Sequence, residues 1–182
     1  YAPNGLQVEG TREVKHIVLG VSASLGLIDE AARRGADVVL VHHGWFWKGE
    51  SPRIAGVKGC RIRHLMQSGM HLVGYHLPLD AHETVGNNAE LARLLGLTIE
   101  SRHGEYGLLH VGEIISGAML AADFAQRVNA ALGRAPLLVG DAQKIVRRIG
   151  WCSGAAQDEL AAAAALGCDL YLSGEIREHT TF

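Results

Sequence analysis

The sequence predicts an α/β protein, and three of its features favour that fold class. Apolar segments of strand length alternate along the chain with longer segments of helical periodicity. In the segment 37–41, four apolar residues follow Asp37 without alternation, as expected of a strand that is covered on both faces. Polar residues directly follow two such segments, at Val41-His42-His43-Gly44 and at Leu172-Ser173-Gly174-Glu175, which is consistent with two similar α/β halves.

The first elements form a strand–helix–strand pattern. An apolar strand is expected over 14–21, and Ser22 and Ser24 are suitable N-caps for the helix that follows. Arg34-Gly35 ends this helix with a basic residue and a glycine, a common helix terminus. The next strand covers 37–41. Such crossovers are right-handed and connect parallel strands, so the pattern predicts a parallel sheet.

The same alternation continues through the rest of the chain. The alanine-rich run 161–165 predicts a helix that packs closely against a sheet, because alanine is the best helix former and its side chain is short. A boundary near residue 100 would divide the chain into lobes 1–100 and 101–182. We expect further helices at 58–68, 87–95, 121–132 and 157–166, and strands at 70–75, twice within 97–117, at 144–152 and at 169–172.

Composition excludes several classes of protein. The formal net charge of the 182 residues is −2, so no basic surface indicates binding to nucleic acid or to an anionic membrane. No apolar run approaches the roughly 20 residues that span a bilayer, and no leader for secretion is evident. The cysteines Cys60, Cys152 and Cys168 form no C-x-x-C pair, and we expect reduced thiols in a cytoplasmic protein.

Polar residues with metal-binding side chains collect after two predicted strands. His42-His43 follows the strand 37–41, and His76, Asp80 and His82 follow the strand 70–75, in a loop that Pro78 stiffens. Because functional groups in α/β sheets gather at the carboxyl ends of strands, these side chains are candidate metal ligands. Capping or surface roles for the histidines remain the alternative.

A pair of adjacent histidines fits a site with two ions. Neighbouring side chains on a straight strand point to opposite faces, but a turn at Gly44 can bring both rings to one rim. His42 and His43 would then each bind a different ion, with Asp80 bridging the two. Imidazole suits Zn and Fe, and carboxylate extends the range toward Mn and Mg.

An aromatic segment follows the histidine pair. Trp45 and Trp47 either close the end of the sheet as a hydrophobic plug or offer a flat surface to a ring-shaped substrate, with Lys48 available for an anion. The sequence contains no G-x-G-x-x-G segment, no G-x-x-x-x-G-K-[ST] phosphate loop and no G-x-S-x-G nucleophile elbow, so nucleotide-binding loops of those kinds and a serine hydrolase are not indicated.

Four segments together resemble the NIF-three-like dinuclear metal-centre family, also labelled GTP cyclohydrolase I type 2 homologues. They occur in the family's order along the whole chain. The segments are Tyr1-Ala-Pro-Asn-Gly-Leu-Gln-Val-Glu-Gly10, Val41-His-His-Gly-Trp-Phe-Trp-Lys-Gly-Glu50, His76-Leu-Pro-Leu-Asp-Ala-His82 with Gly86-Asn-Asn88, and Leu172-Ser-Gly-Glu-Ile176.

The resemblance implies two similar α/β lobes with sheets covered by helices, a dinuclear metal site at the strand ends between them, and toroidal homohexamers. The metal ligands would be His42, His43 and Asp80. His76 lies near the metals in the family pattern and is the candidate catalytic residue, and Glu175 lies near the site without an assigned role. The family's remaining ligands, a histidine and a glutamate, are expected beyond Phe182, so the second lobe is expected to be incomplete in this sequence.

These features lead to two functional hypotheses. The first is a hydrolase with two divalent ions per chain (Zn, Fe or Mn), acting on a small molecule that the family label suggests is a purine nucleotide ring. A metal-activated water would be the nucleophile, and His76 would move a proton, because histidine titrates near neutral pH. The second is a non-enzymatic, ring-shaped metal-binding or interaction protein.

Overall fold

The computed structural model describes residues 2–181 and confirms a mixed α/β fold. The chain forms two compact units, residues 1–79 and residues 80–182. This division lies ahead of the expected boundary near residue 100. Helix α4 (Asn87–Leu95) packs against helix α5 (Ala121–Leu132), which places α4 within the second unit.

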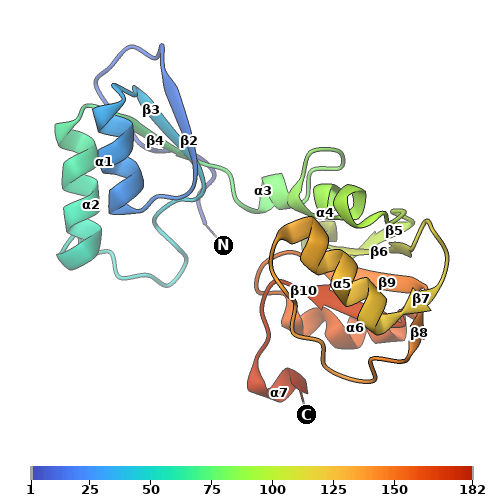
Figure 1. Cartoon of the computed structure of the whole chain (residues 1–182). Helices are drawn as coiled ribbons and strands as arrows, with labels where there is room; N and C mark the ends of the chain where they lie inside the picture. The colour runs from blue at the N-terminus through green and yellow to red at the C-terminus, as the bar shows by residue number, and fades with distance from the viewer. Residues whose placement is uncertain (1, 182) are drawn as a thin grey trace. The chain divides into compact units, whose positions relative to one another are not determined.

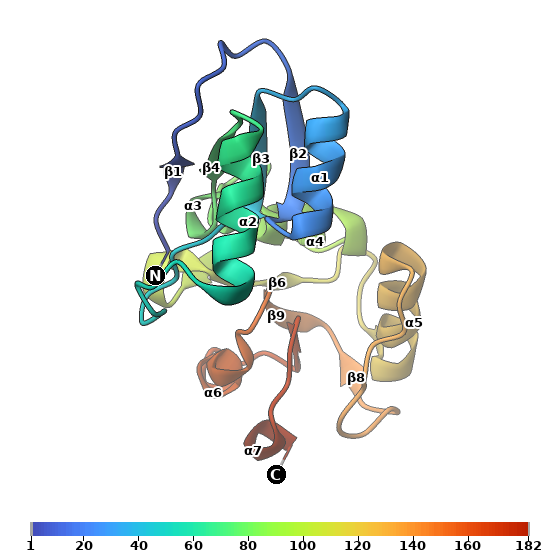
Figure 2. The same cartoon turned by 90° about the vertical axis from the view of Figure 1, so that its left-hand side faces the viewer.

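The first unit contains one four-stranded sheet with the order β1-β4-β3-β2. Strands β2, β3 and β4 are parallel, and β1, which the sequence analysis did not predict, is antiparallel to β4. Figures 1 and 2 show the helices α1 (Leu25–Arg33) and α2 (Gly56–Gln67) side by side on one face of this sheet. The strands are β1 (Gly5–Val8), β2 (Ile17–Ser22), β3 (Val38–His43) and β4 (His71–Gly74).

Helix α1 rests closely on β2. The predicted cap Ser24 accepts a hydrogen bond from the Leu27 amide at 3.2 Å, and Gly35 ends the helix region with φ of 69°. A Cβ at Gly20 would lie 2.3 Å from Cδ2 of Leu27, so glycine lets the Leu27 side chain pack directly onto the strand. The hydrophobic core beneath the helices is fully buried at several positions, Ile28 and Val39 among them.

The two faces of this sheet differ in their coverage. As predicted for the segment 37–41, β3 is largely buried. Strand β2 instead exposes Ile17, Leu19 and Val21 on the face opposite the helices, with exposed fractions of 52%, 71% and 68%. Helices therefore cover the first unit's sheet on one face only.

The second unit contains a four-stranded sheet with the order β10-β9-β6-β5 and a separate two-stranded ribbon, β7-β8. Only β9 and β10 are parallel. The single strand expected over 144–152 is divided, because β8 pairs with β7 while β9 joins the main sheet. The strands are β5 (Ser101–His103), β6 (Leu109–Glu113), β7 (Met119–Leu120), β8 (Ile145–Val146), β9 (Arg148–Cys152) and β10 (Leu170–Ser173).

Helices cover both faces of the second sheet. Ile149 and Trp151 of β9 pack in one core with residues of α4 and α5. Gly150 points to the opposite face, because successive residues of a strand alternate. There a Cβ at Gly150 would lie 3.0 Å from Cβ of Ala163 in α6 (Leu160–Ala165). The alanine-rich helix therefore packs closely against the sheet, as its composition predicts.

Short helical segments complete the chain. The helix expected over 157–166 begins as a 3₁₀ turn and becomes α-helical at Leu160. Neither of two four-residue helices was predicted, since four residues carry no periodicity that a sequence pattern can show. The short segments are α3 (Leu77–Asp80), the 3₁₀ turns Glu105–Gly107 and Gln157–Glu159, and α7 (Glu178–Thr181).

Candidate metal centre

Two adjacent histidines, His42 and His43, are the last residues of β3. Their ring centroids lie 4.5 Å apart, so the end of the strand brings both rings to one rim although neighbours on a regular strand diverge. Glycine at position 44 leaves room for the Gln7 side chain, because a Cβ there would lie 2.2 Å from Oε1 of Gln7. That oxygen accepts a hydrogen bond from the Trp45 amide at 2.7 Å and so fixes the turn against β1.

Hydrogen bonds at Nδ1 orient both rings. Nδ1 of His42 lies 2.9 Å from the carbonyl oxygen of Tyr75, and because a carbonyl can only accept, Nδ1 carries the proton. This tautomer places the lone pair on Nε2, the usual arrangement for a metal-binding histidine whose other nitrogen is held by the protein. Nδ1 of His43 lies 3.2 Å from Oγ of Ser22, the last residue of the neighbouring strand β2.

His76 joins this pair from the loop after β4. Its ring centroid lies 4.9 Å from that of His42 and 5.3 Å from that of His43. The His76 amide donates a hydrogen bond of 2.8 Å to Oδ1 of Asn4, which holds the loop at this position. The structure thus brings together three of the predicted site residues, all within the first unit.

The three imidazoles could hold a metal ion. Each offers one ring nitrogen, and these nitrogens lie within 4.8 Å of one another. With bonds of about 2.0–2.1 Å, a single zinc ion keeps two nitrogens at most about 4.2 Å apart, so small side-chain rotations suffice to close the set around one ion. A site with two ions about 3.5–4 Å apart would need further ligands, and two ions remain a prediction.

Asp80, the predicted bridging ligand, belongs to the second unit and is 7% exposed. Its Oδ1 accepts hydrogen bonds from Nδ2 of Asn87 at 2.8 Å and from Oγ of Ser153 at 3.3 Å. Two donors on one oxygen fix the direction in which the carboxylate points. Its role as a metal ligand stays a prediction.

A fully buried asparagine supports this arrangement, and the sequence analysis quoted it without assigning it a role. Oδ1 of Asn88 accepts a hydrogen bond from the Ser153 amide at 2.7 Å, and its main-chain oxygen accepts one from Nε1 of Trp151 at 2.9 Å. Asn88 therefore ties the start of α4 to the end of β9. Burial raises the pKa of the neighbouring Cys152 to about 11, so this thiol stays protonated near neutral pH.

The predicted aromatic residues occupy different surroundings. Trp45 is 5% exposed, lies in the first unit's core and donates from Nε1 to the Ala23 carbonyl at 2.9 Å, so it resembles the hydrophobic plug. Trp47 lies edge-on to His76, with centroids 5.0 Å apart. The main chain turns between the two tryptophans at Phe46, whose φ of 65° is unusual for a residue other than glycine. Lys48 is exposed.

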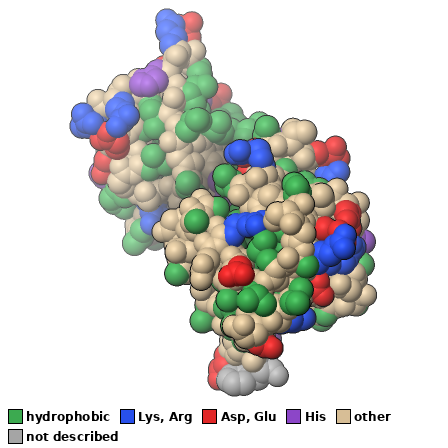
Figure 3. Space-filling view, turned by 45° about the vertical axis from the view of Figure 1, so that its right-hand side comes forward, with side chains coloured by type: hydrophobic (Ala, Val, Ile, Leu, Met, Phe, Trp, Pro, Cys, Tyr) green, Lys and Arg blue, Asp and Glu red, His purple; other side chains and the backbone are tan. Residues whose placement is uncertain are grey.

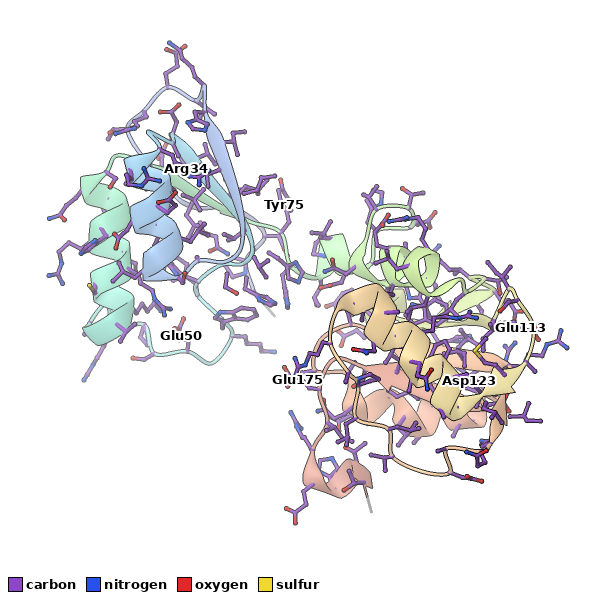
Figure 4. The ribbon with its side chains drawn as sticks, in the orientation of Figure 1. Arg34, Glu50, Tyr75, Glu113, Asp123 and Glu175 are labelled. Carbon is purple, nitrogen blue, oxygen red and sulfur yellow. The ribbon has the colours of Figure 1, made fainter. Side chains whose placement is uncertain are left out.

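Two further polar residues of the sequence pattern lie outside the histidine cluster. Nδ1 of His82 accepts hydrogen bonds from the amides of Thr84 and Val85, each 3.3 Å long, so this ring closes a turn. Glu175 is exposed on the segment after β10, as Figure 4 shows, and its main-chain oxygen accepts a hydrogen bond from Oγ of Ser173.

Comparison with known proteins identifies the relatives of this chain. A family model for Duf34/NIF3 (NGG1p interacting factor 3) matches residues 1–182. The chain belongs to the DUF34/NIF3 family. This confirms the resemblance that the four sequence segments indicated, including the segments that carry the three clustered histidines and Asp80.

Relatives of this DUF34/NIF3 chain extend beyond the part that it covers. A GTP cyclohydrolase 1 type 2 homolog from Pseudomonas aeruginosa is 50% identical over 99% of this chain and 72% of its own length. One from Escherichia coli is 48% identical over 99% of this chain and 72% of its own length. The relatives carry that name, while their similarity alone assigns no substrate to this chain.

Solved structures agree with the fold. Protein ybgI, of unknown function, matches with a TM-score of 0.92 and 47% identity over 100% of this chain and 72% of its own. TTHA1606 from Thermus thermophilus matches with a TM-score of 0.82 and 33% identity over 99% of this chain and 71% of its own. Within residues 2–181 of this DUF34/NIF3 protein, no helix has the length and apolar character needed to cross a membrane.

Proposed function

We propose that this DUF34/NIF3 protein is a dinuclear metal-dependent hydrolase. The observation that supports the proposal is the convergence of His42, His43 and His76, whose ligand nitrogens lie within 4.8 Å of one another. Asp80 is the proposed bridging carboxylate, held by Asn87 and Ser153. Two divalent ions, Zn, Fe or Mn, are the proposed cofactors.

The proposed chemistry assigns a separate task to each histidine. Divalent ions held by such donors lower the pKa of a water molecule toward neutrality and polarise the bond under attack. His42 and His43 present Nε2 as ligand atoms because their Nδ1 atoms contact Tyr75 and Ser22. His76, beside both rings, is proposed to move a proton between water and substrate.

The proposed substrate is a small molecule with a purine nucleotide ring. Support comes from the relatives named GTP cyclohydrolase 1 type 2 homolog and from Trp47, whose ring borders the cluster. Trp45 is proposed to pack in the core next to the site rather than to stack on the substrate, since it is only 5% exposed. Lys48 is the proposed exposed contact for an anionic group.

The test is hydrolysis of GTP and other purine nucleotides by protein reconstituted with Zn, Fe or Mn. His42→Ala and Asp80→Ala are expected to abolish metal-dependent turnover, while His64→Ala on α2 serves as a matched control. His64 pairs with Asp29 at 3.0 Å, outside the cluster. Full activity in chelator-treated protein contradicts the proposal.

His76 is tested separately, because its ring lies close enough to the others to be a ligand as well. A His76→Ala protein that keeps its metal and loses turnover supports proton transfer. Loss of metal from the same variant identifies His76 as a third imidazole ligand instead.

A homo-oligomer, in the form of a toroidal hexamer, and a cytoplasmic location complete the proposal. Support for assembly comes from the apolar side chains Ile17, Leu19 and Val21, which β2 leaves exposed. Exposed apolar side chains occur on both units, as the green atoms in Figure 3 show. Contiguous apolar surface of this kind is typical of protein–protein contacts.

A further inference from the structure

The first unit contains a hollow of about 330 Å³ beside His43. Sites for small molecules begin at roughly 300 Å³, so the volume suits a compact ligand or one part of a larger one. The hollow is bordered by the end of β2, the segment after β3 and helix α2. Figure 4 shows Glu50 on this segment, near the ends where α1 and α2 begin. The polar side chains of the lining are Ser22, Ser24, His43, Glu50 and Arg61.

Arg61 of α2 brings a buried donor to this hollow. Its Nε atom is buried and has no hydrogen-bond partner within residues 2–181. A guanidinium is charged at every physiological pH and has five N–H donors, so a buried Nε–H without an acceptor is unfavourable. A ligand in the hollow with acceptor oxygens would satisfy it after a small rotation of the Arg61 side chain, which lines the hollow.

The charges around the hollow favour an anion. The one acidic side chain in the lining, Glu50, forms an ion pair with Lys58 at 2.9 Å, so the lysine balances its negative charge. Helix α1 begins here, since its N-cap Ser24 lies in the lining, and it has no acidic residue in its first turn. The positive end of this helix dipole therefore adds to the charge of Arg61.

We infer that this hollow binds the phosphate group of a small-molecule substrate, with Arg61 as the principal donor. Hydroxyl groups of Ser22 and Ser24 lie on the same lining, so donors reach the hollow from several directions, as a tetrahedral anion requires. The inference rests on the proposed function for one point only. His43 borders the hollow, which places the reactive part of the phosphorylated molecule at the histidine cluster.

The test is calorimetric titration with inorganic phosphate of metal-stripped and metal-loaded protein. Arg61→Gln removes the guanidinium, and Arg63→Gln is the matched control, since Arg63 is exposed two residues later on the same helix. We expect phosphate affinity to fall at least tenfold in Arg61→Gln and to stay within twofold of wild type in Arg63→Gln, in both metal states. Arg61→Lys keeps the positive charge but lacks the planar guanidinium with its several N–H donors, so its phosphate affinity is expected to lie between those of the wild type and Arg61→Gln.

The outcomes separate this inference from the proposed function. If metal-stripped protein binds phosphate and this binding depends on Arg61, the hollow is a phosphate site even if the protein never binds metal. Binding seen only in metal-loaded protein and unaffected by Arg61→Gln means that phosphate contacts the ions, and overturns the inference. Circular dichroism checks that Arg61→Gln is folded. If that variant unfolds, Arg61→Lys decides the question. Phosphate affinity of Arg61→Lys equal to that of the wild type overturns the inference, and reduced affinity supports it.

Discussion

The two units contain the same strand–helix–strand frame. Strand β2, helix α1 and strand β3 correspond to β9, α6 and β10, with parallel pairing in both. An aspartate precedes the second strand of each frame, Asp37 in the first and Asp169 in the second. In each case Oδ2 accepts hydrogen bonds of 2.9 Å from two consecutive amides at the start of the first strand.

The frames differ in what covers them. Ile17 pairs with Val38, which follows Asp37, and Ile149 pairs with Leu170, which follows Asp169. Ile17 and Ile149 are therefore equivalent, and two residues further along the strands Leu19 is equivalent to Trp151. Trp151 is 0% exposed because α4 and α5 lie over it, whereas Leu19 is 71% exposed. The frame alone therefore does not decide burial, which depends on the helices added around it.

The frames also differ in chemistry at their ends. Counted from the start of the second strand, His42 and His43 correspond to Gly174 and Glu175. In the first unit, Tyr75 and Ser22 orient the two imidazoles, while Glu175 is exposed. The shared frame thus leads to a cluster of histidines at the end of β3 in one unit and to a glycine-containing segment after β10 in the other.

The sharpest contrast in stability is expected from the equivalent positions Trp151 and Leu19. Trp151→Ala should cost about 3–5 kcal/mol, because it leaves a cavity in a close-packed core. Leu19→Ala, on the exposed face, should cost no more than about 0.5 kcal/mol. Urea unfolding followed by circular dichroism measures both, and equal losses would contradict the comparison.

The side chains that position the proposed metal ligand Asp80 are expected to matter less. Asn87→Ala removes a hydrogen bond of 2.8 Å to Asp80 and should weaken metal binding about 10–100-fold. Ser153→Ala removes a longer one, 3.3 Å, and should have a smaller effect. Titration with a chromophoric zinc chelator gives the affinities, and unchanged values in both variants would argue against Asp80 as a ligand.

The contributions of the two equivalent aspartates, Asp37 and Asp169, to folding stability should depend on pH in the same way. Hydrogen bonds from the Lys15 and His16 amides lower the pKa of Asp37. Burial raises the pKa of Asp169, but the amide bonds of Arg148 and Arg147 and the positive charges of Lys144 and Arg148 together lower it. Each carboxylate therefore stabilises the fold above its unfolded-state pKa, and this contribution is lost as pH falls through the lower folded-state pKa. Asp37→Ala and Asp169→Ala should lower the urea midpoint similarly at pH 7, and the difference from wild type should shrink under acidic conditions. Different pH profiles for the two variants would break the equivalence.

The smallest change in folding stability is expected for Leu19→Asp, although its effect on assembly should be clear. A charge on the exposed face of β2 should reduce the oligomer mass measured by light scattering while the circular dichroism spectrum stays unchanged. Val57→Asp is the control, since Val57 is 68% exposed on α2, away from that face. An unchanged mass in Leu19→Asp would place the interface elsewhere.

Sequence reasoning identified the long elements and the residues that carry chemistry. Helices α4 and α5 begin and end as predicted, because Gly96 and Gly133 adopt the left-handed conformation that ends a helix. The short strands β1 and β7 were missed, since their formation depends on pairing with β4 and β8. The helix α3 was missed because four residues show no helical periodicity. The dependence of the site on Gln7 and Asn4 was likewise missed, because neither contact follows from spacing along the chain.

The central claim, that the first unit's histidine cluster holds metal, is tested most directly by metal content per chain. Elemental analysis of protein purified without added metal or chelator should approach about two ions per chain, the number that a dinuclear site requires. The content should fall in His42→Ala and His43→Ala and stay unchanged in His64→Ala. A content near zero in the wild type, even after reconstitution with Zn, Fe or Mn, would contradict the account.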